Sequence, residues 1–202
     1  MNRREASKKE TKKLILKAAR TLFARKGMEE CTIRDIAAKA GVSPASIIVH
    51  FKSKTALLEE ALCGDIERVL SEVAASIPEN YNLRDRLMHL SRGFFSLYDK
   101  NRDLYRALIR STVFEPAAET PIMSNLSERY IQFLSHIIEE QKTQGIILPE
   151  VDCRIAAASV FSLYMGVLIM LLRMPEMTVD MVSDILASMT DQYLNGITRV
   201  HQ

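Results

Sequence analysis

Apolar residues recur at three- and four-residue steps along most of this chain, which is the spacing of amphipathic helices. Near the start, the stripe from Ile15 to Phe23 predicts a helix over 11–26 that ends at Gly27. Further stripes predict six longer helices, over 54–77, 83–100, 102–112, 121–144, 153–174 and 179–196. Only seven glycines and six prolines occur among 202 residues. With two short helices described next, the pattern predicts an all-α fold of about nine helices.

The segment 32–54 has the signals of two short helices joined by a tight turn. Thr32 followed by Asp35 resembles a capping box, and Gly41 is a residue that ends a helix in the left-handed region. Ser43 is a natural N-cap, and Pro44 suits the first helical position. These signals predict a helix-turn-helix, whose second helix can enter the major groove of DNA.

One local signal conflicts with this assignment. Ile47, Ile48 and Val49 are β-branched, and residues of this kind favour strands. We assign a helix over 44–50, because the segment is short, begins at Ser-Pro and lies between two well-signalled helices. With the helix over 11–26 it would form a three-helix head.

Charge is distributed unevenly along the chain. The first 54 residues carry fourteen basic and five acidic side chains, a net charge of +9, whereas the rest carries −7. A basic N-terminal quarter on an acidic body indicates that the first part meets a polyanion. Residues 1–10 are expected to be a polar, basic arm that is flexible in isolation and either follows DNA phosphates, enters a minor groove or stays a solvated tail.

Several classes of function lack support in the sequence. The three cysteines, Cys31, Cys63 and Cys153, are far apart and belong to no metal-binding cluster, so neither a disulfide framework nor a zinc site is expected. Nucleophile elbows, phosphate loops and dinucleotide turns are absent, so we expect no enzyme and no cofactor. The N-terminal residues have charge but no apolar core of a secretory signal, and we expect a cytoplasmic protein.

The pattern divides the chain into two parts. Residues 1–53 would hold the arm and the helix-turn-helix, and residues 54–202 would form a larger helical body. Within the body, 54–77 is expected to be a connector helix, 82–145 a sensor core and 152–200 a pair of dimerisation helices.

The stretch 155–172 contains eighteen residues without a charge, which is long enough to span a membrane. We prefer a helix buried between its own body and a second subunit, since the other helices are amphipathic and Tyr164 lies near its middle. Two such helices from each chain would form an intersubunit four-helix bundle. The predicted interface residues are Tyr164, Leu168, Val182, Leu186, Met189 and Tyr193. Alternatively, this stripe only completes the core of the monomer.

Three stretches of the N-terminal quarter resemble the TetR-type (tetracycline-repressor-like) bacterial transcription regulators: ILKAARTLFARKG (15–27), TIRDIAAKAGVS (32–43) and HFKSKTALL (50–58). The resemblance implies an all-helical homodimer that binds a pseudo-palindromic operator. It also implies a ligand pocket in the body, whose occupation reorients the two heads.

The resemblance also implies which residues meet DNA. Thr32 and Arg34 match positions that often contact a phosphate and a base, respectively, and His50 and Lys54 match usual phosphate partners. Ile48 stands where a tyrosine is usual, which should remove one phosphate contact per subunit. The full set of expected DNA-contact residues is Thr32, Arg34, Ser43, Pro44, Ala45, Ser46, Ile48, Val49, His50, Lys52 and Lys54.

The residue types on the second motif helix limit how bases can be read. Ala45, Ile48 and Val49 can sense thymine methyl groups but cannot make a bidentate hydrogen bond to a base. Arg34 is therefore the expected hydrogen-bonding reader, with guanine as its partner. The alternative for Arg34 is a solvated charge on a helix face.

The body is rich in aromatic residues and methionines, which can line adaptable apolar pockets or simply fill a core. The expected pocket residues are Phe94, Tyr98, Tyr105, Tyr130, Phe133, Phe161 and Met165. A small apolar or aromatic effector of unknown identity would release a repressor from DNA. A corepressor-type regulator, a ligand-independent one and an activator stay open.

Overall fold

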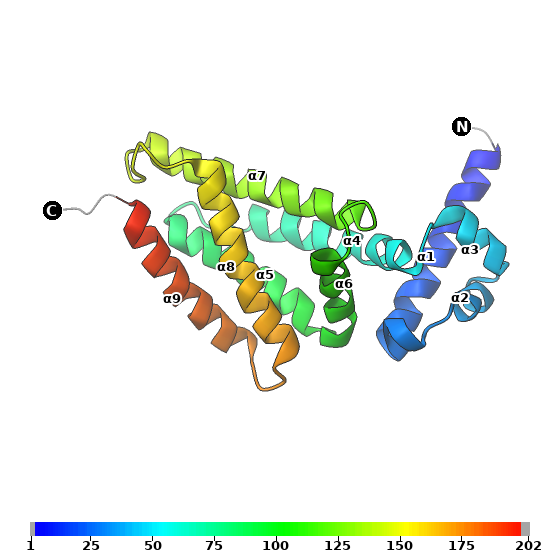
Figure 1. Cartoon of the computed structure of the whole chain (residues 1–202). Coiled ribbons are helices and arrows are strands. Elements are labelled where there is room, and N and C mark those ends of the chain that lie inside the picture. Colours follow the sequence, from blue (N-terminus) through cyan, green and yellow to red (C-terminus); the bar gives the residue numbers. More distant parts are fainter. Residues whose placement is uncertain (1–2, 199–202) are drawn as a thin grey trace. The chain divides into compact units, whose positions relative to one another are not determined.

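A computed structural model of the chain describes residues 3–198, which form nine α-helices and no strand (Figure 1). The all-α class is confirmed. Residues 1–2 of the expected arm and 199–200 of the expected dimerisation segment lie outside the described residues. The helices are α1 (Arg3–Glu30), α2 (Ile33–Ala40), α3 (Pro44–His50), α4 (Lys54–Ala75), α5 (Leu83–Asp99), α6 (Arg102–Phe114), α7 (Pro121–Thr143), α8 (Cys153–Arg173) and α9 (Val179–Ile197).

Packing divides the chain into two compact units. The first unit comprises Met1–Asp65 with Asn101–Ser124, and the second comprises Ile66–Lys100 with Asn125–Gln202. The first unit therefore holds α6 and the beginning of α4 in addition to the helix-turn-helix. The expected functional boundary after residue 53 stays a prediction, since these units follow packing alone.

Helix α1 differs from the expectation at its start. It begins at Arg3, so residues 3–10 are helical where a flexible arm was expected. The physical reason is their composition: Glu, Ala and Lys are good helix formers, and neither Gly nor Pro interrupts them. Gly27 does leave the helix as expected, with φ of 78°, and one further helical turn reaches Glu30.

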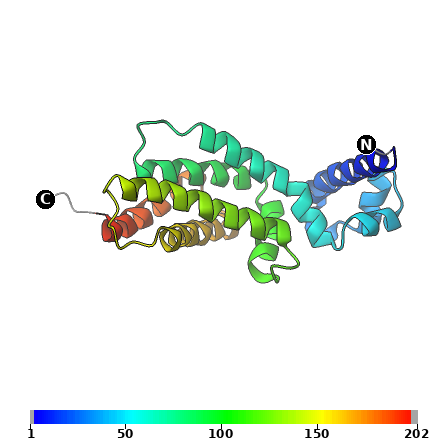
Figure 2. The same cartoon turned by 90° about the horizontal axis from the view of Figure 1, so that it is seen from above.

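The core of the first unit is built from the predicted apolar faces. Helix α1 packs against α2, and α2 packs against α3 (Figure 2). Their largest fully buried side chains, together with those of α4, are Ile15, Phe23, Ile36, Ile47, Leu57, Leu58 and Leu62.

Helix α6 packs on α1 within the first unit. The Arg110 guanidinium pairs with Glu29 at 2.5 Å, and the side-chain amide of Asn101 donates to the carbonyl of Ala24 at 3.2 Å. This packing was not predicted, because 102–112 had been assigned to the body by its position in the sequence.

A buried carboxylate joins α4 to the start of α7 in the first unit. Glu59 is fully buried, and its Oε1 accepts a hydrogen bond from the backbone N–H of Met123 at 3.1 Å. Its Oε2 and the buried hydroxyl of Thr120 make no hydrogen bond within the described chain. Burial raises the pKa of Glu59, and the N–H groups of Met123 and Ile122 partly oppose this.

Because the pKa of Glu59 is higher in the folded than in the unfolded chain, its contribution to stability should be lost as pH rises through the folded pKa. We therefore expect Glu59→Gln, which keeps an acceptor without the charge, to unfold at an equal or higher urea concentration than wild type at pH 7. That advantage should disappear below pH 4.5, the ordinary value for this carboxyl. Glu59→Leu is the control and should cost about 1–3 kcal/mol, because it leaves the Met123 N–H unpaired. A glutamine variant that is clearly less stable at pH 7 would contradict this.

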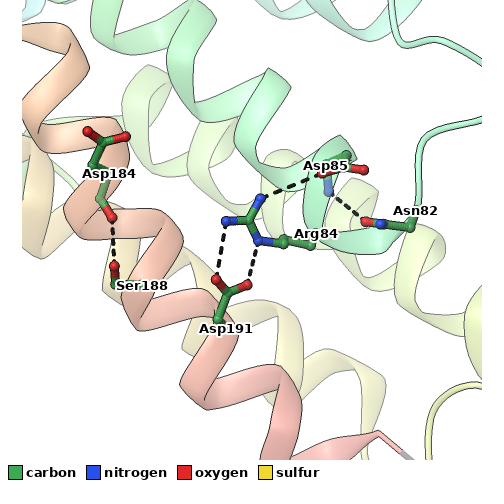
Figure 3. A network of polar contacts seen from close by, with 6 residues as sticks. All are labelled: Asn82, Arg84, Asp85, Asp184, Ser188 and Asp191. Carbon is green, nitrogen blue, oxygen red and sulfur yellow. Dashed lines mark hydrogen bonds and ion pairs between the residues drawn. The ribbon is translucent and has the colours of Figure 1, made fainter. Parts of the chain in front are cut away.

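In the second unit, α5 packs against both α8 and α9, and α8 packs against α9. Arg84 of α5 donates two hydrogen bonds to the carboxylate of Asp191 of α9 (Figure 3). The longer of the two, from Nη2 to Oδ2, measures 3.2 Å. Arg92 of α5 pairs with Asp180 near the other end of α9. These pairs fasten α5 to α9 at both ends of their contact.

Helix α8 is the one helix of residues 3–198 that is long and apolar enough to cross a membrane, with a mean hydropathy of 2.3. A set of its apolar residues is nevertheless buried in the second unit, and this set includes Ala157, Val167, Leu168 and Leu171. The buried face accounts for much of the apolar composition, as in the core helix of a helical bundle.

Gly93 permits a close approach between α5 and the end of α4. A Cβ atom at this position would lie 2.4 Å from Cγ2 of Val73. We expect Gly93→Ala to lower the free energy of unfolding by about 1–3 kcal/mol, because an overpacked core must shift its backbone or side chains. Chemical denaturation would measure this. Gly64→Ala is a matched control on α4, where nothing lies within 4 Å, and it should be neutral or stabilising.

Candidate nucleic-acid interface

The α2–turn–α3 segment is fixed at each end by the caps that its sequence predicts. The backbone N–H of Asp35 donates to Oγ1 of Thr32 at 3.1 Å, and the N–H of Thr32 donates to the Asp35 carboxylate at 2.9 Å. At α3, the N–H of Ser46 donates to Oγ of Ser43 at 3.2 Å, and Pro44 occupies the first turn. The capping box and the N-cap are therefore confirmed.

The turn between the two helices is closed by backbone hydrogen bonds. Gly41 adopts the left-handed region with φ of 69°, and its N–H points to the carbonyls of Ala37 and Ala38. The N–H of Val42 donates to the Ala37 carbonyl at 3.0 Å, as in a Schellman motif. This geometry sets the angle at which α3 leaves α2.

The capping box restricts what Thr32 can offer to a phosphate. Its hydroxyl donates to Oδ2 of Asp35 at 2.8 Å, so both the hydroxyl hydrogen and the backbone N–H are directed at the same carboxylate. The backbone and hydroxyl donors of Thr32, together with Lys26, hold the pKa of Asp35 below its ordinary value. A phosphate contact by Thr32 stays a prediction and would require one of these bonds to change.

Helix α3 presents its apolar residues in two directions. Ile47 is buried in the core, whereas Ile48 and Val49 are 67% and 76% exposed. The helical assignment of this β-branched stretch is confirmed. Exposed aliphatic side chains near the end of α3 form a surface that can contact thymine methyl groups.

The charged candidates differ in how much of their side chain is available. Arg34 and Lys52 are exposed, and neither makes an ion pair or side-chain hydrogen bond among residues 3–198. Lys54 donates to the backbone carbonyl of Glu29 at 3.3 Å, which leaves two of its three hydrogens for other partners. His50 is half-buried at the end of α3, and Ser43, Pro44 and Ala45 are exposed at its start.

The sequence reasoning missed one part of this surface. The helical start of α1 brings Lys8, Lys9 and Lys12 beside Val49 and His50 of α3. The helix-forming composition of residues 3–10 was the signal that could have revealed it.

The expected pocket residues come together only in part. A cluster of aromatic rings in the second unit contains Phe94 and Tyr98 of α5, Tyr130 of α7, and Phe161 and Tyr164 of α8. The distance between ring centroids is 5.4 Å for Phe94 and Tyr130 and 6.0 Å for Tyr130 and Phe161. Burial raises the pKa of Tyr130 and of Tyr164, so both hydroxyls stay protonated. Phe133 and Met165 are half-buried, and Tyr105 belongs to the first unit.

The expected interface residues also divide. Tyr164, Leu168, Val182 and Leu186 are buried within the single chain and form part of its own core. Their stripe arises because α9 packs on α5 and α8. Met189 is exposed and Tyr193 half-buried, so both are accessible at the surface.

Comparison with known proteins identifies the family. Residues 15–61 match the family described as bacterial regulatory proteins, tetR family. The chain is 32% identical over 138 residues to the probable HTH-type transcriptional regulator YttP of Bacillus subtilis, covering 66% of each protein. The chain belongs to the TetR family. The matched segment of this TetR-family chain contains the whole of α2 and α3.

Two further similarities extend beyond the head of this TetR-family regulator. The transcriptional repressor KstR2 of Mycobacterium tuberculosis is 26% identical over 145 residues, covering 68% of this chain and 70% of KstR2. The crystal structure of FadR from Bacillus subtilis in complex with stearoyl-CoA superposes with a TM-score of 0.72 at 19% identity, covering 92% and 98% of the two chains. These relatives are named as transcriptional regulators, which are DNA-binding proteins and not enzymes.

We expect Arg34→Ala to lose about 1–3 kcal/mol of discrimination at one base pair per half-site, because its guanidinium is exposed and uncommitted. Lys54→Ala should instead weaken binding to operator and random DNA alike and flatten the dependence on salt. Fluorescence-anisotropy titrations on both DNAs would distinguish these effects. An equal loss for Arg34→Ala on operator and random DNA would contradict its role as a base reader.

Proposed function

We propose that this TetR-family regulator is a ligand-responsive repressor. It binds a pseudo-palindromic operator as a homodimer and is released by a small apolar or aromatic effector. The observation that carries the proposal is the exposed face of α3, where Ile48 and Val49 point outward from a capped helix-turn-helix. The name of KstR2 supports the repressor role.

For the homodimer we propose the outer faces of α8 and α9 as the interface. Ile155 of α8 is 66% exposed, and Met181 and Met189 of α9 are 44% and 37% exposed. Exposed aliphatic and methionine side chains favour an apolar contact between subunits. Met189 thus belongs both to this exposed surface and to the interface stripe predicted from the sequence.

For the effector we propose the ring cluster of α5, α7 and α8 as the binding region. The cluster is largely apolar, and the hydroxyls of Tyr130 and Tyr164, the latter hydrogen-bonded to Tyr98, carry no charge. Such a lining suits a neutral apolar or aromatic group. The stearoyl-CoA complex of FadR supports ligand binding by this fold.

The second candidate function is a regulator whose effector does not release it from the operator. A corepressor-type protein would bind its operator more tightly with the effector present, and a ligand-independent one would not respond. The direction of the affinity change on addition of effector distinguishes the three.

Sequencing of the fragments of source DNA that the purified protein retains at moderate salt tests the proposal. The matched control is Ile48→Glu/Val49→Glu, which adds two negative charges at exposed positions that the core does not use. We expect one recurring palindrome with the wild type and its loss with the control. Retention without a shared motif would contradict operator binding, and a single unrepeated half-site would contradict the dimer. The genes beside the palindrome would provide effector candidates.

A further inference from the structure

A basic groove lies beside α3 in the first unit. It has a volume of about 350 Å³ and is lined by Glu5, Lys8, Lys9 and Lys12 of α1 and by Val49 and His50 of α3. Its position follows from the helical start of α1, whose lysines lie near the end of α3; Figure 2 shows this part of the first unit near the label N.

Lys12 lines the groove together with the other two lysines. Its ammonium pairs with Glu60 of α4 and lies 5.7 Å from the centre of the ring of Phe51, the residue that ends α3. The charge of Lys12 is therefore largely committed to the protein itself.

Lys8 and Lys9 are in a different situation. Both are exposed, and neither makes an ion pair or side-chain hydrogen bond within the described part of the chain. The lining has three lysines and one carboxylate, that of Glu5. Two uncommitted ammonium groups on one groove create a local excess of positive charge that attracts an anion.

The location of the groove indicates which anion. Val49 belongs both to the groove lining and to the exposed face of α3. A phosphate held in the groove would therefore belong to the strand that borders the base pairs under α3. Lysine ammonium groups bind phosphate as point charges and need no fixed orientation.

We propose that this groove holds one backbone phosphate of each operator half-site, with Lys8 and Lys9 as its main partners. The inference rests on the proposed DNA-binding function and extends the contact surface beyond α2, α3 and the start of α4. Glu5 then acts against binding through charge repulsion with the same phosphate.

The test compares Lys8→Gln/Lys9→Gln with wild type on the operator and on random DNA over a range of salt concentrations. A dimer that loses two phosphate contacts should show a slope of log affinity against log salt that is shallower by about 2, since each contact contributes roughly 0.9. Affinity at moderate salt should fall roughly tenfold on both DNAs. Glu5→Gln should change affinity in the opposite direction.

Lys13→Gln/Lys17→Gln is the matched control, because it removes two charges from exposed positions of α1 that do not line the groove. Phosphate-ethylation interference adds a positional readout: one phosphate per half-site should be sensitive with wild type and insensitive with the groove variant. Equal effects of the two double variants, or an unchanged ethylation pattern, would overturn the proposal.

Failure of the two proposals can be told apart. If wild type selects a palindrome but the groove variant binds with unchanged slope, the groove proposal alone fails. If wild type selects no site, the operator proposal fails. In that case, a salt dependence on random DNA that is shallower for the groove variant than for wild type and the control variant would still support a phosphate site that is used on any DNA.

Discussion

A helix of seven residues cannot hold its conformation alone in water, and α3 is such a helix. It depends on two anchors. Ser43 satisfies its first turn, and Ile47 is buried together with Phe51, the residue that ends it. Because those two side chains fix its rotation about its own axis, Ile48 and Val49 are turned outward. The DNA-facing surface is therefore a consequence of how the opposite face of α3 packs.

Local chemistry was enough to predict most of the head. Thr32, Asp35, Gly41 and Ser43 act through hydrogen bonds within a few residues, so their roles follow from spacing alone. The prediction that the first helix begins only at residue 11 was wrong for a different reason. The charge of residues 3–10 favours a solvated arm, whereas the helix propensity of their Glu, Ala and Lys residues favours the helix that the structure shows.

The second unit shows what periodicity cannot decide. Leu186 and Met189 belong to one predicted stripe, yet the first is buried and the second exposed. A three- and four-residue step indicates that a helix has an apolar face, but not whether its own chain or another covers that face. The aromatic residues of the predicted pocket are likewise divided: Phe94 and Tyr130 are in contact in one cluster, whereas Tyr105 belongs to the other unit. Such assignments require the tertiary structure.

The exposed positions of the head also separate two properties that are often linked in small domains. Arg34, Ile48 and Val49 contribute little to the core, so substitutions there have small consequences for folding. Mutations that alter which operator is read can therefore accumulate without compensating changes elsewhere. A duplicated copy of this regulator could acquire a new set of target genes through few substitutions while its scaffold stays the same.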